Sequence, residues 1–190
     1  MSNATRPDAA SPQLYRFADD GKTPNNPHLP LILYRNVLRA PIGQDPAAMC
    51  EDMFGEHGWA NGWRNGIYPF LHFHTRTHEV LGIARGTARV EFGGDKGQML
   101  DVQAGDVVVL PAGTGHRRVS SSADLLVVGA YPTTGGSLDQ ARPSEIDRSQ
   151  AGSRPSRRGS RTEGAGFSSV KSNRWRRCDD ARRTTGPQPG

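Results

Sequence analysis

The sequence predicts a small all-β domain, an antiparallel barrel or sandwich, followed by a tail that has no core of its own. Between Trp63 and Tyr131, short runs of β-branched and aromatic residues are interrupted by Gly, Pro and Asp about every eight to ten residues, as in sheets built from short strands. Residues 87–92 alternate polar and apolar side chains, as expected of a strand with one buried face. After Asp139, Arg, Ser, Gly and Pro dominate, so this part cannot bury enough surface to fold alone.

The residues before this stretch predict one strand and one short helix. Residues 1–28 lack a periodic apolar pattern, so we expect an N-terminal arm, with ordered structure beginning near Leu29. The run Leu-Ile-Leu-Tyr at 31–34 predicts a strand. Asp45, followed by Pro46 and AAMCEDMF, predicts a short helix that Asp45 caps and that Gly55 or Gly58 ends.

Turn residues divide the remainder into further strands. Arg85-Gly86 predicts a turn before the strand at 87–92, and GGDKG at 93–97 predicts a loop after it. The apolar run at 107–110 predicts a strand covered on both faces, and residues 125–130 predict the last strand. We therefore divide the chain into an N-terminal arm (1–28), a folded domain (29–140) and a basic, disordered tail (141–190).

Composition and charge exclude several classes of protein. No run approaches the 18 or more apolar residues of a membrane span, and the first residues lack the apolar stretch of a secretory signal; we expect a cytoplasmic protein without a membrane partner. The net charge of +5 comes from the tail, because residues 1–140 hold 12 basic and 14 acidic residues and residues 141–190 hold 12 and 5. No aromatic stacking pattern accompanies the basic tail, so a nucleic-acid partner is not expected.

A cluster of histidines marks the candidate site. Three of the six histidines fall in the segment LHFHTRTHE at 71–79. Residues two apart in a strand point to the same face, so His72 and His74 would aim both imidazoles into the same space. Glu79 would add an oxygen ligand from the next strand, and His116, beyond the turn at 111–113, would add a fourth ligand. This set predicts a site for one divalent metal ion.

The fourth ligand has an alternative on sequence grounds. Simple alternation places His78, not Glu79, on the face shared by His72 and His74, unless the turn at 75–77 resets the alternation. Structural histidines satisfied by backbone groups are the alternative to a metal site as a whole. His78 is also the best candidate for a general base, while Glu79, if released from a metal, would shuttle a proton; we therefore name both as catalytic candidates.

The motifs resemble those of the cupins. The first cupin motif is matched in every spacing by Gly66, His72, His74, Glu79 and Gly86, and the second by Gly105, Pro111, Gly113 and His116, with Ser120 where Asn is expected. The sequence around the motifs, over about residues 30–140, resembles that of the YjlB-like group of bacterial cupins. The resemblance implies a double-stranded β-helix, a jelly-roll-like barrel related to RmlC, with a metal on His72, His74, Glu79 and His116. A homodimer is common among such relatives.

Two functions from different classes follow from this resemblance. The first is a metal-dependent enzyme (oxygenase, decarboxylase or isomerase) that acts on a small carboxylated or enolisable molecule with one Fe, Mn, Ni or Zn ion. The alternative is a non-catalytic cupin that binds or senses a small molecule in the same cavity. The tail departs from its relatives, which continue into a further ordered segment; an out-of-frame ending after about Ser144 is our hypothesis for it.

Other side chains could contribute to the cavity. Arg118 shares the strand parity of His116 and could pair with a substrate carboxylate there, although an exposed arginine at the rim is the commoner outcome. Tyr68, Phe70 and Phe73 could line an apolar pocket or simply form core.

Overall fold

Two antiparallel sheets form a barrel in the computed structural model, which describes residues 11–134 and 138–143. The larger sheet has the strand order β1-β2-β7-β4-β9-β3 and the smaller β6-β5-β8. The strands are β1 (Gln13–Tyr15), β2 (Leu31–Tyr34), β3 (Trp59–Asn65), β4 (Glu79–Arg85), β5 (Thr87–Phe92), β6 (Gln98–Gln103), β7 (Val107–Leu110), β8 (His116–Ser121) and β9 (Leu126–Pro132). A short 3₁₀ turn, η1 (Gly94–Lys96), joins β5 to β6. This architecture confirms the predicted all-β double-sheet barrel.

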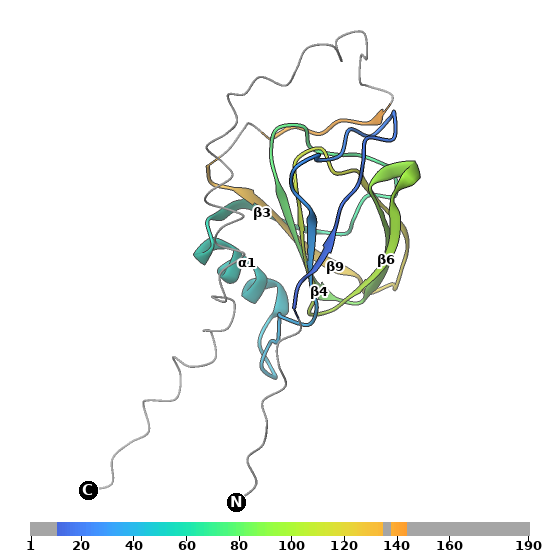
Figure 1. Cartoon of the computed structure of the whole chain (residues 1–190). Helices are drawn as coiled ribbons and strands as arrows, with labels where there is room; N and C mark the ends of the chain where they lie inside the picture. The colour runs from blue at the N-terminus through green and yellow to red at the C-terminus, as the bar shows by residue number, and fades with distance from the viewer. Residues whose placement is uncertain (1–10, 135–137, 144–190) are drawn as a thin grey trace, which may run out of the picture.

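The larger sheet is covered on both faces. The helix α1 (Pro46–Glu56) packs against the outer face through β3, β4 and β9, and the smaller sheet covers the inner face (Figure 1). In β7, Val107 and Val109 join the core under the helix, while Val108 and Leu110 join the core between the sheets. The continuous apolar run therefore has the physical cause that the sequence predicted, because both faces of this strand are buried.

The predicted helix is confirmed together with its cap. The Asp45 side chain accepts a hydrogen bond from the backbone N–H of Ala47, and Pro46 occupies the first turn, where its missing N–H costs nothing. The helix passes through Gly55 and stops before Gly58, whose φ of 80° lies in the left-handed region that ends helices.

The expectation that ordered structure begins near Leu29 is wrong. β1 pairs with β2 through Gln13–Tyr15, and Asn25 is buried, with its amide donating to the carbonyls of Ala18 and Gly93. Backbone pairing at a sheet edge and a buried amide leave no apolar periodicity in the sequence, so the usual signal was absent. The structure thus places residues 11–28 against the barrel.

The other end of the described chain also reaches beyond the predicted boundary at residue 140. Ala141 exchanges two backbone hydrogen bonds with Phe73, at 3.0 and 2.9 Å. The predicted disordered tail (141–190) and its proposed out-of-frame origin from about Ser144 fall mostly on residues 144–190, which lie outside the described residues, as do residues 1–10 and 135–137. Among the described residues, no helix has the length and apolar character needed to cross a membrane.

A buried carboxylate joins the end of β2 to the β6–β7 turn. Asp106 is fully buried and accepts hydrogen bonds from the backbone N–H groups of Asn36 and Gln103, at 3.0 and 3.1 Å, and from the Arg35 guanidinium at 2.7 Å. Each oxygen of this carboxylate is therefore satisfied, which makes its burial tolerable.

We predict that Asp106→Ala lowers the free energy of unfolding by about 3 kcal/mol, because it leaves buried N–H donors and a guanidinium without an acceptor. Urea denaturation checks this. Asp95→Ala is the control, since Asp95 and Lys22 form an exposed ion pair that should contribute less than about 1 kcal/mol. Equal losses in the two variants would contradict the assignment.

Candidate metal centre

Four side chains named from the sequence come together between the two sheets. His72 and His74 lie in the segment that leads into β4, Glu79 is the first residue of β4, and His116 is the first residue of β8. His72 and His116 exchange two backbone hydrogen bonds, at 3.2 and 2.9 Å, which hold the two segments side by side. The Glu79 oxygen Oε2 lies 3.5 Å from Nε2 of His74 and 3.3 Å from Nε2 of His116.

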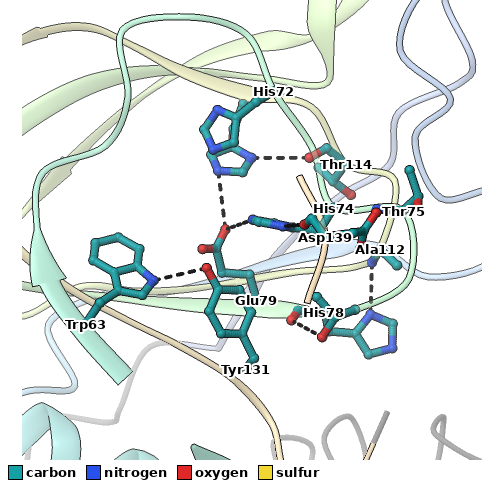
Figure 2. A network of polar contacts seen from close by, with 12 residues as sticks. Trp63, His72, His74, Thr75, His78, Glu79, Ala112, Thr114, Tyr131 and Asp139 are labelled. Carbon is teal, nitrogen blue, oxygen red and sulfur yellow. Dashed lines mark hydrogen bonds and ion pairs between the residues drawn. The ribbon is translucent and has the colours of Figure 1, made fainter. Parts of the chain in front are cut away.

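The three imidazoles have the same orientation relative to the backbone. Nδ1 of each ring faces a main-chain carbonyl: that of Phe70 for His72, Asp139 for His74 and Thr114 for His116. Figure 2 shows the contact of His74 with Asp139. A carbonyl can only accept a hydrogen bond, so Nδ1 must carry the proton, and Nε2 of the neutral ring keeps its lone pair. Histidines that bind metals are held in this way, with the second ring nitrogen donating to a carbonyl or carboxylate.

The charge of Glu79 is deeply buried and incompletely satisfied. Its side chain is 3% exposed, and Oε2 makes no hydrogen bond although two imidazole nitrogens lie within ion-pair distance. Burial opposes ionisation of Glu79, but the contacts with His116 and His74 outweigh it and lower its pKa. Burial likewise opposes protonation of His74, yet Glu79 raises the pKa of that imidazole. The Glu79 carboxylate therefore lies within ion-pair distance of the Nε2 atoms of two imidazoles.

His72 differs electrostatically from His74. Burial, and then the neighbouring His116, lower the pKa of His72 to about 3, so its imidazole is neutral at physiological pH. Its ring centroid lies 4.1 Å from that of His116 and 6.0 Å from that of His74. Only neutral imidazoles can bind a metal ion, which His72 satisfies without losing a proton.

The structure does not bring His78 into this group. Nδ1 of His78 accepts a hydrogen bond from the backbone N–H of Ala112 at 2.9 Å, and the ring lies away from the Glu79 carboxylate (Figure 2). The Nδ1 lone pair, with which a general base would accept a proton, is therefore already used in the hydrogen bond from Ala112. The turn at 75–77 interrupts the alternation, so Glu79, not His78, shares the interior with His72 and His74.

A cavity of about 370 Å³ opens beside these residues, a size that suits a small ligand. Besides the four clustered side chains, the cavity is lined by six aromatic or aliphatic residues, Trp63, Ile67, Tyr68, Leu81, Tyr131 and Leu138, and by the polar residues Arg64, Asn65, Asp139 and Gln140. The Trp63 indole N–H donates to the Tyr131 hydroxyl at 3.1 Å, and both side chains flank Glu79 (Figure 2). Burial, and then the Glu79 charge, raise the pKa of Tyr131, so its phenol stays protonated.

A glycine makes room for the Trp63 indole in the cavity wall. Gly129 of β9 pairs with Trp63 of β3, and a Cβ at Gly129 would lie 2.1 Å from the indole. The missing side chain therefore lets the indole lie flat across the sheet. The other aromatic residues that could line a pocket or form core have different positions. Phe73 is fully buried in the core, while Tyr68 is 47% exposed at the cavity rim. Phe70 packs under the Arg142 guanidinium, 4.0 Å from the ring centre.

Sequence reasoning missed Asp139. Its carbonyl accepts from His74, and its carboxylate accepts from the backbone N–H groups of Thr75 and Arg76, at 2.9 and 3.0 Å. Asp139 thus ties the turn that follows His74 to the segment that follows β9. No motif marks this residue, because it stands where the composition changes to that of the tail; only the pairing of Ala141 with Phe73 brings it to the site.

The three imidazoles and the Glu79 carboxylate are chemically suited to bind a divalent metal ion. Two ligand atoms that are each about 2.1 Å from one ion lie about 3.0–3.4 Å apart in octahedral or tetrahedral geometry, close to the two separations from Glu79 Oε2. The described residues nevertheless contain no group of three or more His, Cys, Asp or Glu side chains already arranged to hold an ion. The centroid of the His74 ring lies 6.0 Å from that of His72 and 6.3 Å from that of His116. These wide separations agree with the absence of a preformed group of three ligands among the described residues.

Comparison with solved structures gives matches of low sequence identity, three of which follow. An 11S globulin from Wrightia tinctoria is 17% identical, over 43% of this chain and 22% of that chain, with a TM-score of 0.33. Acireductone dioxygenase from Bacillus anthracis, with a cadmium ion in its active centre, is 15% identical over 57% of this chain and 82% of that chain, with a TM-score of 0.40. A variant of Bacillus subtilis oxalate decarboxylase is 16% identical over 65% of this chain and 27% of that chain, with a TM-score of 0.33.

Sequence comparison gives the family. The model of the family described as Cupin matches residues 62–140, which include all four clustered side chains. The protein YjlB of Bacillus subtilis strain 168, which bears the description "uncharacterized", is 44% identical over 120 residues, covering 63% of this chain and 69% of that protein. Together with the barrel, these matches show that the chain belongs to the cupin family, in its YjlB-like group.

Proposed function

We propose that this cupin is a metal-dependent enzyme that acts on a small carboxylated or enolisable molecule, with one divalent ion bound by His72, His74, Glu79 and His116. The observation that carries the proposal is the buried Glu79 oxygen without a hydrogen bond, placed beside two imidazole Nε2 atoms. A buried carboxylate oxygen without a donor is costly. A cation bound to it and to the imidazoles would remove that cost, after modest side-chain adjustment.

A bound divalent ion would supply Lewis-acid polarisation of a substrate oxygen. The chain itself supplies the surroundings. The aromatic and aliphatic part of the cavity wall would limit the access of water to the reacting group, and the protonated Tyr131 hydroxyl would stay beside Glu79. The carbonyls of Phe70, Thr114 and Asp139 would hold the imidazoles in the tautomer that leaves Nε2 available.

Metal content tests the proposal directly. We expect about one Fe, Mn, Ni or Zn ion per freshly purified chain by elemental mass spectrometry. Replacing one ligand, in His74→Ala, should weaken binding on the order of 100-fold or more, because even an outer-shell change costs about 10–100-fold. His28→Ala is the matched control, since His28 is exposed and lies outside the cavity. Full metal content in His74→Ala would contradict the proposed ligand set.

Turnover separates the enzyme from a binding module. The metal-loaded protein is offered a panel of small carboxylic and enolisable compounds, and oxygen uptake and substrate depletion are followed with and without a chelator. Turnover that is lost on chelation and in His74→Ala supports the enzyme. Tight ligand binding that survives chelation, without turnover, would replace it with the binding cupin.

We predict that Asp139→Ala lowers metal affinity about tenfold, because it releases the hydrogen bonds to Thr75 and Arg76 that hold the carbonyl partner of His74 in place. Competition with a chelating dye measures the affinity. Asp52→Ala, at an exposed helix position, should keep the wild-type affinity. If the two variants bind the metal equally well, Asp139 does not position His74.

A further inference from the structure

A second cavity, of about 270 Å³, lies beside the first one. One wall is the segment 65–69, of which residues 65–68 also line the metal-centre cavity. The opposite wall consists of Arg118 and four residues after it in the chain, Ser121, Ser122, Ala123 and Leu125. Tyr68, Pro69 and Ala123 are exposed, so this second cavity opens to solvent. None of the four clustered ligand side chains lines it.

The register of β8 directs Arg118 inward. Arg118 pairs with Val90 of β5, which is fully buried in the core between the sheets. Residues directly opposite each other in an antiparallel pair share a face, so Arg118 stands on the interior face of its sheet. Arg117 stands on the other face and pairs with Glu91 at 2.8 Å. The backbone N–H of Arg118 donates to the Tyr68 carbonyl at 2.9 Å, which ties this position to the opposite wall.

The guanidinium of Arg118 lacks a carboxylate partner within the described part of the chain. Its Nη1 donates to the Ser121 hydroxyl at 2.8 Å, whereas its Nε is buried and makes no hydrogen bond. No acidic side chain is among the residues that line the cavity. By contrast, Arg35, Arg64 and Arg117 each form an ion pair with a carboxylate.

A buried charged donor without an acceptor costs free energy, and a complementary anion removes that cost. The edge of a guanidinium formed by Nε–H and one Nη–H matches the two oxygens of a carboxylate. The cavity presents a single cationic side chain, which balances a carboxylate more closely than a phosphate dianion. Ser121 holds the guanidinium from the other side and keeps its own hydroxyl proton available for donation.

We propose that this second cavity is a binding site for the carboxylate group of a small organic anion, held by Arg118 with Ser121. The site is distinct from the metal centre and does not depend on the proposed function. From the sequence, Arg118 could face the cavity of His116 or lie exposed at the rim; the structure assigns it to the neighbouring cavity.

Titration of the full chain with benzoate tests the site, with the Arg Nε–H resonances observed by NMR spectroscopy. Benzamide, which has the same shape without the charge, and inorganic phosphate are the comparison probes. We expect a saturable shift of the Arg118 Nε–H with benzoate, none with benzamide, and weaker binding of phosphate. Tighter binding of phosphate would replace the carboxylate with a phosphate ligand and overturn the proposal.

Arg118→Met removes the charge and keeps much of the side-chain length. It should weaken benzoate binding by at least about tenfold, since hydrogen bonds to charged groups contribute about 1.5–3 kcal/mol. Arg117→Met is the matched control, because it carries the same change on the other face of the same strand, and it should bind benzoate like the wild type. Equal weakening in both variants would mean general attraction to a basic surface, which overturns the site.

Two further measurements keep the test decisive. Should Arg118→Met fail to fold, Arg118→Lys retains the charge but lacks the Nε–H and Nη–H pair, and it should also weaken binding; wild-type affinity in that variant overturns the proposal. Benzoate binding is also measured after chelation and in His74→Ala. Unchanged affinity supports a site separate from the metal centre, and loss of binding shows that the anion occupies the metal site instead.

Discussion

The backbone pairing of His72 with His116 is the contact on which the candidate metal centre depends. Its two hydrogen bonds join the segment before β4 to the first residue of β8. Because β8 belongs to the smaller sheet and Glu79 begins β4 in the larger one, the four clustered side chains meet only when the two sheets close on each other. The same closure buries the core between the sheets, so folding and assembly of the site are one event.

A comparison of two buried carboxylates, Asp106 and Glu79, shows how a structural acid differs from a candidate functional one. Asp106 receives hydrogen bonds from two backbone N–H groups and from Arg35, and these satisfy it within the fold. Glu79 is almost equally buried, yet one of its oxygens makes no hydrogen bond and lies 3.3 and 3.5 Å from two imidazole nitrogens at the edge of a cavity. Glu79 combines its unpartnered oxygen with two imidazole nitrogens at ion-pair distance, which is why it is the centre of our functional proposal.

The same comparison extends to the cations. Arg35, Arg64 and Arg117 are neutralised by carboxylates of the chain itself, while Arg118 has a buried Nε–H and only a hydroxyl as its partner. The segment 65–68 lines both the metal-centre cavity and the cavity at Arg118. This segment thus lies between the metal site and the carboxylate site that we propose.

The sequence by itself determined the all-β class, the Asp45-capped helix, the strand at 107–110 with two buried faces, and three of the four clustered side chains, His72, His74 and His116, because each leaves a local signal in residue type and spacing. It did not determine that Glu79, not His78, faces the interior, that residues 11–28 pack on the barrel, that Asp139 holds His74, or that Arg118 lines a separate cavity. Those outcomes depend on a turn that resets strand alternation and on hydrogen bonds between residues far apart in the chain. Only closure of the two sheets decides them, since no local pattern records which distant backbone groups will meet.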